Sequence, residues 1–191
     1  MNTIIQILRY KLLWLVALLT VVISTSTIFD YRFALPGFGF LYLFMDMLGY
    51  YFLASNGKPT TKYELGPTDE VRIKAFRIYA FVASNVILGL VIALIWVLLG
   101  FKAALIVGVG SFLLWWFGVY EILYYKFYKL TLDKEWNWVY WTPVGILKAL
   151  FKGKNVIKTF LKKDTVVVTD KEMRIQAALG TILVIAFLII I

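Results

Sequence analysis

Residues 103–130 read AALIVGVGSFLLWWFGVYEILYYKFYKL, and this stretch decides the fold class. Its first part is almost entirely apolar, and its end collects tyrosines and lysines. About 20 apolar residues are enough for one helix to cross a bilayer, where backbone polar groups must be bonded within the helix. Tyrosine and lysine mark the level of the lipid headgroups. We therefore predict a membrane-spanning helix over residues 103–125.

The composition of the whole chain agrees with this interpretation. The 191 residues are 62% hydrophobic and 16% charged, with a mean hydropathy of +0.83. Soluble domains are about 45–50% apolar, so we predict one all-α integral membrane domain over residues 1–191. The chain has no cysteine and no histidine, which excludes disulfides, thiolate-bound metals, histidine-bound haem or zinc, and histidine-based catalysis. We expect no cofactor and no metal. The net charge of +9 does not indicate a nucleic-acid partner in so apolar a chain.

Four further apolar stretches flank the first one along the chain. The five predicted spans are residues 12–29, 33–55, 78–100, 103–125 and 175–191. The first follows a basic start, as in a signal peptide, but we expect it to remain as a helix. Gly100 predicts a tight turn between the third and fourth spans.

The positive charges test this topology. With the N-terminus in the cytoplasm, inner segments hold two basic residues before the first span, five in residues 58–77 and eleven in residues 126–174. These are 18 of the 20 basic residues, and only Arg32 and Lys102 fall outside. Lysine and arginine near span ends stay on the cytoplasmic side. We therefore predict the N-terminus inside, the C-terminus outside, and a location in a prokaryotic cytoplasmic membrane.

Residues 131–174 form the predicted cytoplasmic interfacial segment. Thr142 and Pro143 indicate a helix start and Gly153 a stop, and a second basic amphipathic pattern follows. We expect both helices to lie on anionic lipid; the alternative is that they only close the inner face of the bundle. We expect a short strand at residues 165–169. The residues expected to contact lipid headgroups are Trp136, Trp138, Trp141, Lys148, Lys152, Lys154, Lys158, Lys162 and Lys163.

Three polar side chains lie at membrane depth in this topology: Asp46, Asn85 and Glu121. Counting along each helix places all three in the cytoplasmic half, so we expect them to form one polar layer. Placing an acidic side chain inside a membrane costs free energy, so acidic residues found there are candidates for function. The alternatives are structural: Glu121 could pair with a nearby lysine or arginine, and Asn85 could bond a neighbouring helix.

Small residues also suggest how two spans pack. Phe81, Asn85, Gly89 and Ala93 share one face of the third span. The corresponding face of the fourth span carries Gly110, Leu114, Phe117 and Glu121. Glycine allows close helix approach, so we expect these two faces to meet.

The leading functional hypothesis is a non-catalytic subunit or accessory of a membrane assembly that also binds anionic lipid. The sequence has no nucleophile elbow, phosphate-binding glycine loop or metal-ligand cluster. Its expected partners are lipids and either other membrane subunits or further copies of itself. An alternative is a small transporter or channel, as a single chain or as a homo-oligomer, that uses Asp46 and Glu121 for a cation or proton. A further alternative is an enzyme acting on lipid headgroups, which lacks an evident group to support its general base.

Overall fold

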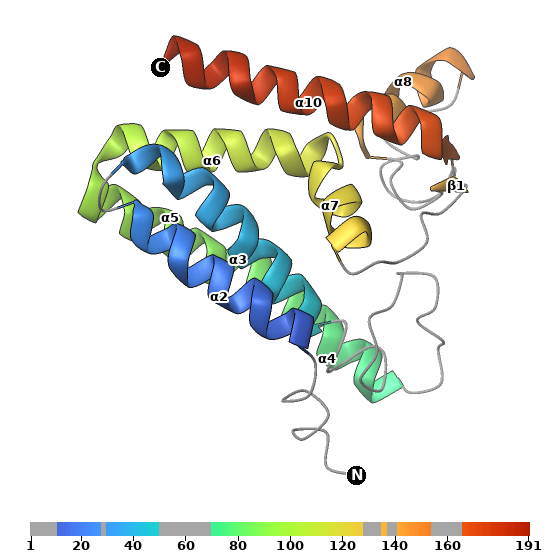
Figure 1. Cartoon of the computed structure of the whole chain (residues 1–191). Coiled ribbons are helices and arrows are strands. Elements are labelled where there is room, and N and C mark those ends of the chain that lie inside the picture. Colours follow the sequence, from blue (N-terminus) through green and yellow to red (C-terminus); the bar gives the residue numbers. More distant parts are fainter. Residues whose placement is uncertain (1–10, 28–29, 50–69, 128–134, 137–140, 154–165) are drawn as a thin grey trace. The chain divides into compact units, whose positions relative to one another are not determined.

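The computed structural model describes residues 11–27, 30–49, 70–127, 135–136, 141–153 and 166–191 (Figure 1). Most of these residues are helical, as predicted. Among the described residues, two helical segments, Ile78–Leu99 and Asp170–Ile190, are long and apolar enough to cross a membrane, and a bent pair of helices would make a third. The chain forms two compact units, Met1–Ser111 and Phe112–Ile191.

In the part that the structure describes, all regular elements of the first unit are helical. Its elements are α2 (Lys11–Ser26), the 3₁₀ turn η1 (Tyr31–Phe33), α3 (Ala34–Gly49), α4 (Glu70–Phe81), the π-helical segment η3 (Val82–Ile87), α5 (Leu88–Leu99) and the first turns of α6 (Phe101–Trp116). The segments α4, η3 and α5 follow one another without a gap. The third predicted span is therefore a helix with a widened turn near its start.

Two short connections lie at the same end of this unit. One is η1, between α2 and α3; the other is Gly100, which alone separates α5 from α6. Gly100 has φ +88°, a backbone conformation that favours glycine, so the predicted tight turn is confirmed. The ammonium group of Lys102 lies 5.9 Å from the ring centroid of Tyr31, which brings the two connections together.

The core of the first unit joins α3, α5 and α6. Ala34, Phe38, Leu88 and Val107 are buried against one another. The predicted contact through Gly89 and Gly110 is wrong. Gly89 has no atom within 4 Å of the position of a Cβ, whereas Gly110 faces the side chain of Leu35 on α3. The α5 face that packs inward carries Leu88, Val91, Ile92 and Ile95 instead, because these larger apolar side chains fill the space beside α3 and α6.

The second unit combines helices with a small sheet. After the last turns of α6, its elements are α7 (Val119–Phe127), β1 (Glu135–Trp136), α8 (Pro143–Phe151), β2 (Val168–Thr169) and α10 (Asp170–Ile190). The strands are antiparallel, with Glu135 opposite Thr169 and Trp136 opposite Val168. A short strand was expected at residues 165–169, but its partner β1 was not predicted.

The fourth predicted span is not one continuous helix. It breaks at residues 117–118, and α6 and α7 are bent by 76° relative to each other. Gly118 has φ +74°, so this residue ends α6 in a conformation that other residues rarely adopt. We expected one membrane-spanning helix over residues 103–125, and the structure instead has two helices there.

Local capping fixes the ends of α8 and the start of α10. The Thr142 hydroxyl accepts the N–H of Gly145, Pro143 is the first helical residue, and Gly153 follows the helix with φ +63°. These boundaries of α8 match the prediction. Thr169 and Glu172 form a reciprocal capping box at the start of α10, which begins before the predicted span.

Candidate functional site

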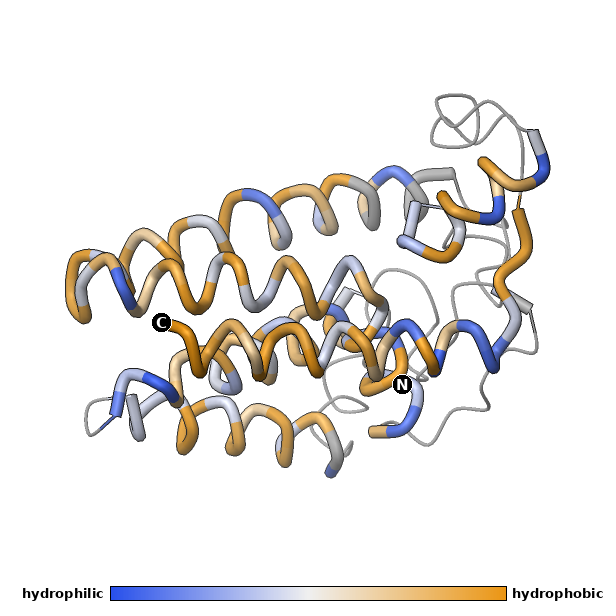
Figure 2. The backbone as a smooth tube through the Cα atoms, turned by 90° about the horizontal axis from the view of Figure 1, so that it is seen from above, coloured by the Kyte–Doolittle hydropathy of each residue, from blue (hydrophilic) through white to orange (hydrophobic). Residues whose placement is uncertain are grey.

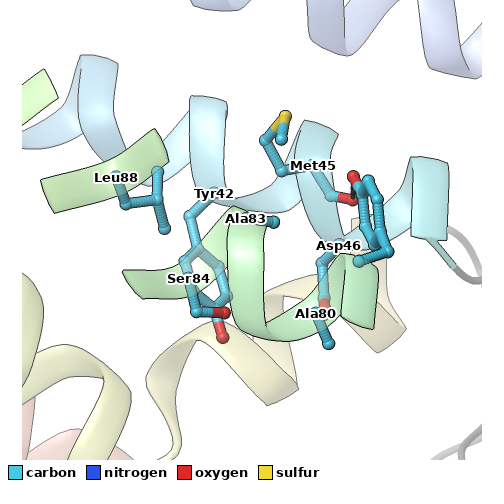
Figure 3. A pocket seen from close by; sticks show the side chains of 8 residues that line it. Tyr42, Met45, Asp46, Ala80, Ala83, Ser84 and Leu88 are labelled. Atoms are coloured by element: carbon cyan, nitrogen blue, oxygen red, sulfur yellow. Dashed lines mark hydrogen bonds between the residues drawn. The ribbon is translucent and has the colours of Figure 1, made fainter. Parts of the chain in front are cut away.

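Asp46 lines a small pocket in the first unit (Figure 3). The pocket has a volume of about 20 Å³, which is room for one water-sized molecule. The residues around it are Tyr42, Met45, Asp46, Tyr79, Ala80, Ala83, Ser84 and Leu88. Carboxylate and hydroxyl oxygens at one small cavity are groups that can hold water, a proton or a small cation.

Helix geometry explains how these groups come together. Tyr42 and Asp46 are four residues apart and therefore share a face of α3. The Tyr79 hydroxyl of α4 donates a hydrogen bond to the backbone oxygen of Met45 at 2.5 Å, which joins α4 to α3 beside Asp46. Ala83 and Ser84 belong to η3, and π-helical turns occur frequently at functional sites. The sequence indicated Asp46 but not its neighbours, because the pairing of α3 with α4 is a tertiary contact.

The other two members of the predicted polar layer are not among the residues that line this pocket. Asn85 is exposed, does not line this pocket, and donates through Nδ2 to the backbone oxygen of Phe81 in its own helix at 3.0 Å. Glu121 is buried on α7 in the second unit. The structure thus places Asp46 beside Tyr79 and Ser84 rather than beside Asn85. A functional role for Asp46, Asn85 and Glu121 stays a prediction.

The tryptophans of the predicted lipid-binding segment differ from one another. Trp136 is 0% exposed and packs against Tyr125, with ring centroids 5.0 Å apart. It is therefore a core residue of the second unit rather than an exposed anchor, because the β1–β2 pairing holds it inside. Trp141 is partly exposed and stacks on Trp115 at 4.3 Å. Its backbone oxygen accepts the indole N–H of Trp116 at 3.0 Å. Trp138 lies outside the described residues.

The ammonium group of Lys148 is bound by other residues of the second unit. Its Nζ lies 2.6 Å from Glu172 Oε2 and donates to the backbone oxygen of Val167 at 2.9 Å. Glu172 precedes the apolar stretch of α10. Burial alone would raise the pKa of its carboxyl group, but hydrogen bonds from Lys148 and Thr169 outweigh this and hold the pKa below its usual value of 4.5. Lys148 therefore joins α8 to α10.

The remaining predicted lipid contacts are only partly described. Lys152 is exposed at the C-terminal end of α8. Four further lysines, Lys154, Lys158, Lys162 and Lys163, lie outside the described residues. The side chains of α8 that point outward are Leu147, Leu150 and Phe151, with exposed fractions of 51%, 56% and 88%. The inward face of α8 carries the small residues Gly145 and Ala149.

Gln176 of α10 contacts both α8 and the break between α6 and α7. Its Oε1 accepts the backbone N–H of Val144 at 3.2 Å, and its Nε2 lies 2.9 Å from Met173 Sδ. A Cβ placed on Gly118 would lie 3.5 Å from Nε2 and would overlap the end of the Met173 side chain. Gln176 is 1% exposed, so this amide is a buried polar group whose hydrogen bonds fix the start of α8.

No protein family, curated protein or solved structure matches this chain. Within the described residues, no group of three or more acidic side chains is arranged to hold a metal ion.

Proposed function

We propose that this chain is an integral membrane protein with five spans, its N-terminus in the cytoplasm and its C-terminus outside. The observation that carries this proposal is the placement of charge. Of the 20 basic residues, 18 fall in alternate connecting segments, and each predicted span coincides at least in part with a described helix. The proximity of Lys102 to Tyr31 supports it further, because the two connections expected outside lie at one end of the first unit.

Cysteine labelling in intact cells tests this topology, since the chain has no cysteine of its own. A cysteine at Gly100 should react with an impermeant maleimide added outside. A cysteine at Lys154 should react only after the membrane is permeabilised. The reverse result would exclude the proposed orientation.

Within this class, we propose a non-catalytic subunit or accessory of a larger membrane assembly. This role is supported by the missing catalytic motifs and by extensive apolar helix surface, as on α5 and α10, which can meet lipid or partner helices. Native mass spectrometry of the protein extracted from its own membranes should show a second subunit or further copies. A lone monomer under these conditions would contradict this role.

The proposed assembly also binds anionic lipid through its cytoplasmic lysines. Replacing Lys152, Lys154, Lys158 and Lys162 with glutamine removes four charges from the full-length protein. At about 1 kcal/mol per lysine near an anionic surface, these changes should weaken retention of anionic lipid by up to roughly a thousandfold. Lys148→Gln is the matched control, because Lys148 is already paired with Glu172. Equal loss of lipid from both variants would contradict a specific role of the four lysines.

A transporter or channel for a cation or proton is the second candidate function. It is favoured by the pocket at Asp46, where a carboxylate, hydroxyl groups and a π-helical segment meet. Flux into liposomes should then fall strongly in Asp46→Asn, and in Glu121→Gln if both acids act. Flux that neither substitution changes, or no flux at all, would exclude this function.

A further inference from the structure

The start of α10 marks where the second unit meets the membrane. Four of the five residues in 170–174 are charged, and Asp170 pairs with Arg174 at 2.7 Å. From Ile175 to the end of the helix, the only polar side chains are Gln176 and Thr181. Figure 2 shows the same change from hydrophilic to hydrophobic along α10. Charged side chains stay out of the hydrocarbon, so the membrane boundary of this unit lies close to Ile175.

The helix α6 ends at this same level. Gly118, the residue of the break, packs against Met173 and Gln176, which lie on either side of Ile175. Phe117 packs against Gly180, slightly deeper along α10. Trp115 and Trp116, in the last turn of α6, contact Trp141, and tryptophan is enriched at membrane–water interfaces.

We infer that the fourth crossing ends with α6, and that α7 lies in the headgroup layer with Leu123 and Lys126 facing lipid. This inference rests on the proposed membrane location. If α6 crosses nearly upright, a bend of 76° turns α7 almost into the membrane plane. Leu123 and Lys126 are exposed, whereas Tyr120, Glu121, Tyr124 and Tyr125 are buried. A leucine beside a lysine suits this depth, since leucine inserts among acyl chains and lysine extends to the headgroups.

The position of α8 supports the same boundary. Its second residue, Val144, is hydrogen bonded to Gln176, and Lys148 binds Glu172 on the polar side of Ile175. Val144, at the start of α8, therefore lies at the level of Gln176, close to Ile175. Apolar side chains at this depth are expected to be covered by lipid.

Nitroxide labels on single cysteines test this inference in the full chain, reconstituted in phosphatidylcholine–phosphatidylglycerol vesicles. Labels at Val119, Leu123 and Phe127 follow one side of α7, at intervals of four residues. Labels at Ile182 and Ile185 serve as hydrocarbon references, and one at Lys171 as the water reference. Relative accessibility to oxygen and to a soluble nickel complex gives the depth of each label, and thermal melting checks that each variant is folded.

The depths of the three labels on α7 should differ by only about 3 Å, or by up to roughly 7 Å if α6 is tilted by 20°. A helix that continued the crossing would spread the same three labels over about 12 Å. That larger spread would overturn the inference while leaving the membrane proposal intact. A Leu123 label reached by neither reagent would also overturn it, since protein would then cover this face. If the Ile182 and Ile185 labels were open to the nickel complex, the membrane proposal itself would fail.

Discussion

The backbone N–H of Val144 donates a hydrogen bond to Oε1 of Gln176 at 3.2 Å. Val144 is the second residue of α8, so its N–H has no partner within the helix. The Thr142 hydroxyl accepts the next N–H, that of Gly145, and Pro143 has none. Gln176 therefore completes the N-terminal cap of α8 from a different helix. Together with the pair of Lys148 and Glu172, this contact attaches α8 to α10.

Replacing Gln176 with leucine should destabilise the protein by about 1–3 kcal/mol. The substitution keeps a similar volume but leaves the N–H of Val144 without its buried acceptor. The melting temperature in detergent should fall measurably. Thr181→Val is the control, because the Thr181 hydroxyl bonds only to the backbone of its own helix, at Ala177. Equal melting temperatures for the wild type and Gln176→Leu would show that this hydrogen bond does not stabilise α8.

A methyl group at Gly118 should be more harmful than one at Gly108. Gly118 has φ +74°, and an added Cβ would lie 3.0 Å from Met173 Sδ and overlap the terminal methyl of that side chain. The left-handed backbone costs about 1–2 kcal/mol for a residue with a Cβ, and the displacement of Met173 adds to this. Gly108 is helical with nothing within 4 Å of the added atom. Thermal melting should therefore show a clear loss for Gly118→Ala and none for Gly108→Ala.

The pair of Lys148 and Glu172 should show a measurable coupling energy. Both side chains are partly exposed, so we expect about 0.5–1 kcal/mol from a double-mutant cycle with Lys148→Gln and Glu172→Gln. The stability of each variant can be measured by chemical unfolding in detergent. Lys152→Gln, on the exposed end of α8, should be additive with Glu172→Gln. Additivity for Lys148 as well would mean that the contact contributes nothing to stability.

The same carboxyl group predicts a pH dependence. The pKa of Glu172 is lower in the folded protein than its usual value of 4.5. Because this pKa is lowered in the folded protein, ionised Glu172 stabilises the fold fully above about pH 4.5. This stabilisation is lost as the pH falls through the pKa of the folded protein. The melting temperature of the wild type should therefore exceed that of Glu172→Gln at pH 7, with the difference shrinking in acid. A difference that stayed constant down to pH 3 would contradict this assignment.

Some features of this protein follow from the sequence alone because their causes are local. The length of an apolar run sets whether a helix could cross a bilayer, and residues 78–99 and 175–190 show this directly. Thr142, Pro143 and Gly153 define α8 through their own backbone and hydroxyl chemistry, and Gly100 supplies the turn before α6. In each case the deciding atoms lie within a few residues of the feature that they produce.

The tertiary structure decided which side chains meet. Gly118 lies in an apolar run that reads as one helix, yet α6 ends there against Met173, from far along the chain. Lys148 was predicted to contact lipid, but its ammonium group is paired with Glu172. Trp136 was predicted to be an interfacial anchor, but the β1–β2 pairing and Tyr125 bury it. Asp46 acquired Tyr79 as its neighbour in the same way. Residue type sets what a side chain can bind, whereas only the packing of distant helix faces determines the partner present.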